Sequence, residues 1–298
     1  MFCLKDISVR LTGLPFWLAA KSAMAITAYL PLVVSFILYS IINIYLVIPT
    51  KIVNLNKKKY AAVKTCYKSI FFLKLIIIIK MKQKSVEIFI PGPSGRLEGK
   101  YFKNSKNNSP VAIILQPHPQ YGGTMNNKIV QETYNVFVKN NFSVLRINFR
   151  GVGKSEGTFD NGQGELSDAA AALDWIEREN QDYSQCWVSG FSFGSLICMQ
   201  LIMRRPEVNK FIAIAPQPNV YDFTFLAPCP ASGQVVYGEK DELVSRDSIN
   251  ELNNRLKSQK GIEVNFSEIK GANHFFKEKE EELKKTIDKY IKDKTKLI

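Results

Sequence analysis

From Ser85 onward, short apolar segments alternate with amphipathic segments, and this alternation limits the folds open to the chain more than any other feature. Val111–Leu115 is wholly apolar, which is typical of a strand that is buried on both faces of a sheet. In Glu165–Arg178 the apolar residues recur at helical spacing, which predicts a helix with one buried face. Strands that alternate with helices of about 10 to 15 residues indicate a mostly parallel sheet with helices on both faces.

The same criteria predict one α/β domain over residues 81–298. The expected strands are Ser85–Ile90, Arg96–Phe102, Val111–Leu115, Ser143–Phe149, Cys186–Ser189, Phe211–Ala215, Gln234–Gly238 and Ile262–Ile269. The expected helices are Asn127–Lys139, Glu165–Arg178, Phe193–Arg204, Asp247–Lys257 and a closing helix that buries Leu283, Ile287, Tyr290 and Ile291. A tight turn rich in Pro and Gly, residues 91–95, joins the first two strands as an antiparallel edge. The expected fold class is therefore α/β, with a mostly parallel, doubly wound sheet, preceded by an apolar N-terminal segment.

The positive charge of the chain is concentrated before residue 81. Of its 40 Lys and Arg and 27 Asp and Glu, residues 1–80 carry eleven basic residues and one acid, Asp6. The remainder has 29 basic and 26 acidic residues, which is an ordinary balance for a globular domain. No basic patch with interleaved aromatic residues follows residue 81, so we do not expect nucleic acid as a partner.

Residues 1–80 admit two interpretations. Ala23–Ile48 contains no charged residue and is long enough to cross a bilayer, which makes residues 23–48 a candidate membrane contact. More lysines follow this stretch than precede it, so the positive-inside rule predicts that the C-terminal domain faces the cytoplasm. Alternatively, residues 1–80 are an extension that the domain does not need. Five cysteines without CxxC spacing indicate a reducing compartment, without disulfides or a metal site.

The motif most specific for chemistry is Gly190-Phe191-Ser192-Phe193-Gly194, a GxSxG sequence between an expected strand and an expected helix. A sharp turn at this junction forces the serine into a strained conformation and exposes its hydroxyl above the sheet. The two glycines leave space for the neighbouring backbone. Ser192 is therefore the candidate nucleophile, and a structural turn serine is the alternative.

A serine hydroxyl is a weak nucleophile that needs a base, and the sequence has only two histidines. His274 lies in a loop between the last strand and the last helix, where its imidazole can be directed at Ser192. A carboxylate must then orient the imidazole. Asp241, directly after a strand, is the first candidate for this role, and Asp222 in the preceding loop is the alternative.

Residues 85–298 resemble the α/β-hydrolase superfamily, in particular a bacterial branch with a minimal cap. The resemblance rests on Pro117–Met125, Asn148–Gly157 and Gly190–Ser195, together with the loops that carry Asp241 and His274. Ser, Asp and His also follow one another in the chain order of α/β-hydrolase triads. The resemblance implies a hydrolase fold and these catalytic roles, and it leaves the substrate open because the fold hosts many chemistries.

The resemblance also implies an oxyanion hole, formed by the backbone N–H of Phe193 and one from the loop at His118. Pro119 replaces the glycine that usually follows this histidine, and proline has no N–H. Gln120 is therefore the expected second donor, with Tyr121 as the alternative because the proline shifts the turn. We expect His118 to brace this loop rather than to act in catalysis.

The loop that contains Arg150, within Asn148–Gly157, is also expected to support the site. Its Gly153-Lys154-Ser155 sequence looks like the end of a phosphate-binding P-loop. That motif requires a glycine five positions before Gly153, where this chain has Asn148, so nucleotide binding is not expected.

The expected function is that of a serine hydrolase that cleaves a carboxylic ester or thioester through an acyl-enzyme. It requires no cofactor or metal, and its partner is a small-molecule or acyl-bearing substrate; the oligomeric state is left open. Two alternatives remain: a serine peptidase or amidase, and a non-catalytic binding protein on the same fold. The expected location is the cytoplasm, with tethering to the membrane if residues 23–48 form an anchor.

Overall fold

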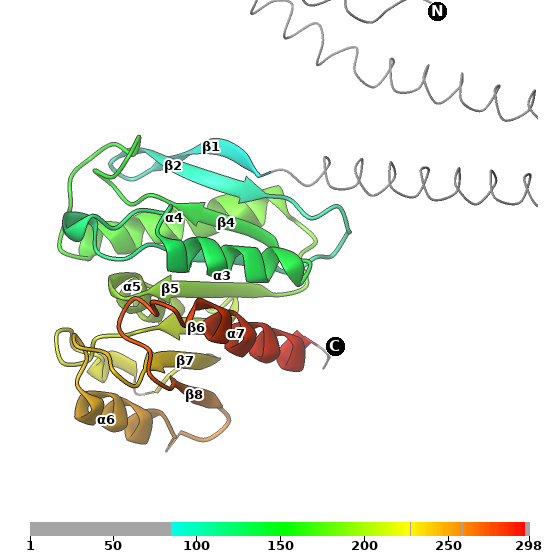
Figure 1. Ribbon diagram of the computed structural model, residues 1–298. Coiled ribbons are helices and arrows are strands. Elements are labelled where there is room, and N and C mark those ends of the chain that lie inside the picture. The colour runs from blue at the N-terminus through cyan, green and yellow to red at the C-terminus, as the bar shows by residue number, and fades with distance from the viewer. Residues whose placement is uncertain (1–84, 227, 258, 296–298) are drawn as a thin grey trace, which may run out of the picture. The chain divides into compact units, whose positions relative to one another are not determined.

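The computed structural model describes residues 85–226, 228–257 and 259–295, and these form an eight-stranded sheet flanked by helices (Figure 1). The strands lie in the order β1-β2-β4-β3-β5-β6-β7-β8. β1 pairs antiparallel with β2, and β2 antiparallel with β4, while all the other neighbours are parallel. The mostly parallel sheet with an antiparallel N-terminal edge is confirmed.

The elements lie close to their expected positions. The strands are β1 (Val86–Gly92), β2 (Gly95–Phe102), β3 (Val111–Leu115), β4 (Ser143–Ile147), β5 (Cys186–Phe191), β6 (Val208–Ile214), β7 (Ser232–Gly238) and β8 (Val264–Ile269). The helices are α3 (Lys128–Lys139), α4 (Gln163–Glu179), α5 (Phe193–Ile202), α6 (Arg246–Lys257) and α7 (Glu280–Thr295). Two short 3₁₀ turns, Pro119–Tyr121 and Thr224–Leu226, lie in the loops.

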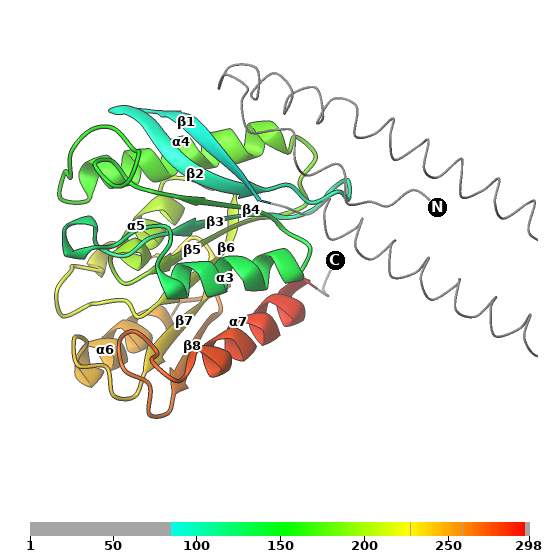
Figure 2. The same ribbon diagram turned by 45° about the horizontal axis from the view of Figure 1, so that its top comes forward.

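Alternate residues of each central strand enter two separate cores. In β3, Val111, Ile113 and Leu115 pack into the core beneath α4, α5 and α6. Ala112 and Ile114 pack into the opposite core, beneath α3 and α7. Figures 1 and 2 show α3 and α7 side by side on one face, with α4 on the other. This double covering explains why the central strands are wholly apolar.

The start of β6 is the largest difference from the expected boundaries. The strand begins at Val208, three residues before the expected Phe211. Val208 is buried and pairs with Cys186 of β5, whereas Asn209 is exposed and Lys210 is partly exposed. Asn209 and Lys210 obscure the beginning of the strand in the sequence, and the pairing with β5 shifts register at Asn209.

The predictions for residues 1–80 lie outside the described residues. These include the candidate membrane contact of residues 23–48. Among the helices of the described part, none is long and apolar enough to cross a membrane. Within the same part, Cys186, Cys198 and Cys229 are buried and free.

The loops that follow β3, β5, β6, β7 and β8 gather at one edge of the sheet, on the left in Figure 1. They do so because the carboxyl ends of parallel strands all meet at the same edge, where ligands bind in open α/β sheets. Every candidate for nucleophile, base or acid in the sequence lies in one of these loops.

Candidate active site

Ser192 stands between β5 and α5 in a backbone conformation that side chains rarely adopt, with φ of 54° and ψ of −117°. Its N–H donates to the carbonyl oxygen of Ile214 over 2.8 Å. A Cβ atom on Gly190 would lie 1.9 Å from the carbonyl oxygen of Gly194. A Cβ on Gly194 would lie 2.5 Å from that of Gln116. The turn therefore closes only with glycine at both positions, as the motif predicts.

His274 lies between Ser192 and Asp241. Its Nε2 is 3.0 Å from Ser192 Oγ, and its Nδ1 is 2.8 Å from Asp241 Oδ2. The other carboxylate oxygen of Asp241 accepts the N–H groups of Leu243 (2.9 Å) and Val244 (3.1 Å). The side chains of His274 and Asp241 are only 1% and 2% exposed. The three residues expected to act together are thus hydrogen-bonded in one line.

Asp222, the alternative to Asp241, takes part in a different interaction. Its carboxylate accepts the backbone N–H of Thr224 over 2.7 Å and the hydroxyl of the same residue over 2.8 Å. The bond from the Thr224 N–H holds the pKa of Asp222 below its ordinary value. Asp222 therefore caps the turn at Thr224–Leu226, and the structure pairs His274 with Asp241.

The loop at His118 departs from expectation. The N–H of Gln120 donates to His118 Nδ1 over 3.2 Å, and Gln120 does not line the cavity at Ser192. The N–H of Tyr121, the alternative donor, is bonded to the His118 carbonyl oxygen over 3.2 Å, although its side chain lines the cavity. The expectation that the Gln120 N–H joins that of Phe193 in an oxyanion hole is thus corrected, because His118 caps the 3₁₀ turn that begins at Pro119 and accepts the Gln120 N–H.

His118 braces this loop. Its ring packs against those of Tyr121, Phe159 and Phe193, with centroids 4.7 to 4.9 Å apart. Burial lowers the pKa of His118, so its imidazole is neutral near pH 7. Because Nδ1 accepts the Gln120 N–H, the proton of the ring lies on Nε2.

A cavity of about 390 Å³ opens above Ser192. Its lining includes the Pro117–His118 and Tyr121–Gly123 segments and His274, together with residues of the loop after β6. One of these, Gln217, was not singled out from the sequence: its amide oxygen lies 3.2 Å from Ser192 Oγ and can accept its hydroxyl proton. No motif marks this position, so only the fold could bring it to notice.

The sequence profile of the X-Pro dipeptidyl-peptidase (S15) family, a member of the α/β-hydrolase superfamily, matches residues 86–294. The chain belongs to this family. A protein of unknown function from Agrobacterium tumefaciens, proposed to be an α/β hydrolase, has 50% sequence identity to this hydrolase. The alignment covers 71% of this chain and 97% of that one, with a TM-score of 0.69.

Two further solved structures have the same fold. An α/β serine hydrolase homologue from Coxiella burnetii is 32% identical, and the match covers 69% of this chain and 96% of that chain, with a TM-score of 0.62. An α/β serine hydrolase without a lid from Xanthomonas campestris is 26% identical, over 70% and 94% of the two chains, with a TM-score of 0.63. These similarities and the family together identify the protein as a hydrolase of the α/β-hydrolase superfamily.

Arg150 holds the loop after β4 to α4. Its guanidinium makes two bonds to the Asp168 carboxylate, of 2.7 and 3.0 Å, and its backbone N–H makes a third of 2.9 Å. The Asp168 side chain is fully buried, and its hydrogen bonds raise the pKa of Arg150. Arg150 therefore ties the loop after β4 to α4.

The segment that resembles a P-loop is tied to the edge of the sheet. Ser155 Oγ donates to the Asn148 carbonyl oxygen (2.8 Å) and accepts the N–H of Glu98 (2.9 Å). The buried carboxylate of Glu98 accepts the Asn148 side-chain amide and the Lys154 N–H, both over 2.8 Å. These partners use the groups that would otherwise face a phosphate.

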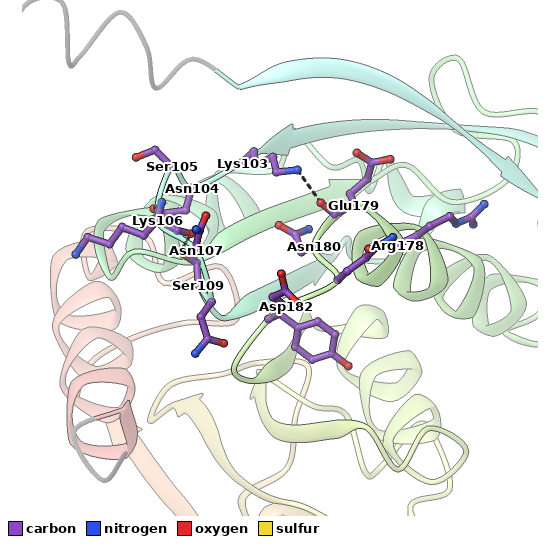
Figure 3. Close-up of a pocket in the computed structure, with 13 residues that line it drawn as sticks. Lys103, Asn104, Ser105, Lys106, Asn107, Ser109, Arg178, Glu179, Asn180 and Asp182 are labelled. Atoms are coloured by element: carbon purple, nitrogen blue, oxygen red, sulfur yellow. Dashed lines mark hydrogen bonds between the residues drawn. The ribbon is translucent and has the colours of Figure 1, made fainter.

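A larger hollow, of about 570 Å³, lies at the opposite edge of the sheet (Figure 3). Polar side chains from the segments after β2 and after α4 line it, and Lys103 Nζ donates to the Glu179 carbonyl oxygen across it (2.7 Å). It holds no serine paired with a histidine, since both histidines lie in the cavity at Ser192. Across the described residues, no group of three Asp, Glu, His or Cys is placed to bind a metal ion.

We predict that Asp168→Ala lowers the free energy of unfolding by about 3–5 kcal/mol, because it leaves the buried Arg150 guanidinium without its hydrogen-bonded counterion. Urea denaturation measures this loss. Asp174→Ala is the matched control: Asp174 pairs with Arg205 at the surface, where such a pair contributes about 1 kcal/mol or less. Equal losses in the two variants would contradict a bracing role for Arg150.

Proposed function

We propose that this protein is a serine hydrolase that cleaves carboxylic esters or thioesters through an acyl-enzyme on Ser192. One observation carries the proposal: Ser192 Oγ, the His274 ring and the Asp241 carboxylate form a line of hydrogen bonds of 3.0 and 2.8 Å. Nucleophile, base and orienting acid are thereby within reach of one another, as catalysis by a serine requires.

The reaction has two halves. Ser192 Oγ attacks the carbonyl carbon while its proton passes to His274 Nε2, and the protonated ring then gives this proton to the leaving alcohol or thiol. Water next attacks the acyl-enzyme, gives a proton to His274 and releases the acid, after which Ser192 recovers its proton. Asp241 holds the ring in the correct tautomer throughout and stabilises its charged form.

The start of α5 stabilises the oxyanion in this proposal. Phe193 is the first residue of the helix, so its N–H belongs to the set that a helix leaves without an intrahelical partner. The helix dipole adds partial positive charge at the same point. Both effects strengthen as the carbonyl oxygen becomes negative, and they therefore favour the transition state over the bound ester.

The chemistry of the cavity supports an uncharged ester or thioester rather than a peptide with a free amino terminus. Its lining residues include no Asp, Glu, Lys or Arg. An exopeptidase of the kind that names the family must bind an α-ammonium group, and a buried charge needs an opposite charge as partner. Asp241 cannot serve, because it lies behind His274 and is bonded to it.

Apolar side chains surround the mouth of this cavity. Seven large apolar side chains in the described residues are exposed, and four of them line it: Tyr121, Val220, Leu243 and Phe275. Exposed apolar residues that gather at one place mark a binding surface, whereas scattered ones need no explanation. The substrate therefore carries an apolar group that covers this rim.

We predict that Ser192→Ala abolishes ester hydrolysis and labelling by a fluorophosphonate, with an unchanged melting temperature. Loss of a triad nucleophile costs several orders of magnitude in kcat. Turnover on p-nitrophenyl esters and gel-based labelling provide the two measurements. A non-catalytic binding protein would give neither signal in the wild type, and residual turnover above about 1% in the variant would exclude Ser192 as nucleophile.

Asp241→Asn should lower kcat by about 10³- to 10⁴-fold, because an amide no longer fixes the tautomer of His274. Asp222→Asn is the matched control, since Asp222 only caps a surface turn, and its kcat should stay within about tenfold of wild type. Steady-state kinetics on one ester compares the two variants. The opposite order of effects would assign the acid to Asp222.

For p-nitrophenyl esters we predict that kcat/KM rises about fourfold with each added acyl methylene until the cavity is filled, since each buried methylene contributes about 0.8 kcal/mol. Val220→Ser should reduce this rise, whereas Val86→Ser, at an equally exposed site on β1, should not. Faster cleavage of an X-Pro p-nitroanilide than of any ester would favour the peptidase alternative.

A further inference from the structure

Gln217 is held firmly beside the nucleophile. It follows β6, and its carbonyl oxygen accepts two backbone N–H groups, from Val220 (3.0 Å) and Tyr221 (2.9 Å). Its side chain lines the cavity, and its amide oxygen Oε1 lies 3.2 Å from Ser192 Oγ, positioned to accept the hydroxyl proton. The backbone is thus fixed at the point from which the amide reaches the reacting oxygen.

The number of protons shared by Ser192, His274 and Asp241 decides whether the Gln217 amide donates or accepts a hydrogen bond. A carboxylate only accepts hydrogen bonds, so the bond to Asp241 places a proton on His274 Nδ1. When His274 is neutral and able to act as base, its Nε2 is therefore an acceptor. Ser192 has one hydroxyl proton, and that proton must lie in the bond to His274 Nε2 if the ring is to remove it.

Ser192 Oγ then has no proton left for Gln217, so the amide atom that faces it must be a donor. The oxygen and nitrogen of an amide have nearly the same shape, and their partners decide the orientation. The structure has Oε1 toward Ser192. Turning the amide to bring Gln217 Nε2 toward Ser192 Oγ gives every group in the line a partner of the opposite kind when His274 is neutral. We propose that Gln217 is a further catalytic residue, which donates its amide N–H to Ser192 Oγ when His274 acts as base.

This hydrogen bond has two effects on the attack. It occupies one lone pair of Ser192 Oγ, so that the hydroxyl stays in one rotamer with another lone pair free for the carbonyl carbon. It also stabilises the negative charge that develops on Oγ as His274 removes the proton. When His274 carries both protons, the amide turns, and its oxygen accepts the Ser192 proton instead. The orientation of Gln217 therefore follows the protonation of the base.

The inference rests on the proposed function, and its test uses the full chain with p-nitrophenyl esters and a fluorophosphonate. Gln217→Met keeps the approximate size of the side chain and removes the donor. It should lower kcat and the rate of labelling about 10- to 100-fold, with KM within threefold of wild type. Gln217→Glu should lose at least a further tenfold, because a carboxylate can only accept and it opposes the charge on Oγ. Gln181→Met, an exposed site at the opposite edge of the sheet, is the matched control and should match wild type.

Two outcomes would overturn the inference. Unchanged kcat in Gln217→Met would mean that the amide merely borders the cavity. Increased kcat would mean that the amide oxygen holds the Ser192 proton away from His274 in the active state. Ser192→Ala in the same assays separates this failure from failure of the proposed function: if it remains active, Ser192 is not the nucleophile, whereas if it is inactive, only the role of Gln217 is lost. Melting temperatures show whether each variant is folded.

Discussion

The site depends on the contact between the start of α5 and the end of β3. Gly194 lies so close to the Gln116 carbonyl oxygen that a Cβ atom would come within 2.5 Å of it. Gln116 is fully buried, and its side chain donates to the Gly123 carbonyl oxygen (2.9 Å) and accepts the Phe149 N–H (3.2 Å). One polar side chain thereby joins the serine turn to the loops after β3 and β4. A side chain at Gly194 would push α5 away from β3 and displace Ser192 relative to His274. Rate gains from proximity are lost when reacting groups are displaced in this way.

Buried polar groups hold the loop after β4 beside this contact. Arg150 and Asp168 neutralise one another, and Glu98 satisfies the donors of the Asn148 side chain and of Lys154. A buried ion pair adds little net stability compared with an apolar pair of the same size, but its partners are costly to separate. Such interactions therefore fix a single loop conformation, which suits loops that must carry side chains to defined positions.

The sequence was sufficient to predict the architecture and that Ser192, Asp241 and His274 lie together, because each depends on a local pattern or on chain order. The periodicity of apolar residues marks strands and helices directly, and GxSxG marks a turn with a specific geometry. The expectation for Gln120 was wrong because the His118 side chain accepts the Gln120 N–H, and packing against Phe159 and Phe193 holds that ring in place. Gln217 could not be found either: its position depends on how the loop after β6 folds back over β5, which no local pattern records.

The hydrogen-bonded residues and the exposed residues at the rim of the cavity come from different parts of the same loops. Ser192, Asp241 and His274 are nearly buried and sit where strands end, so their geometry is set by the sheet. Tyr121 and Val220 are 87% and 57% exposed and make no part of the hydrogen-bonded line, so substitution there changes what fits the cavity while the reacting groups stay in place. An α/β-hydrolase can in this way keep one mechanism and accept many substrates. Under the proposed function, the absence of charged residues from the cavity lining disfavours charged substrates, because a charged group would have to leave water without gaining a counterion.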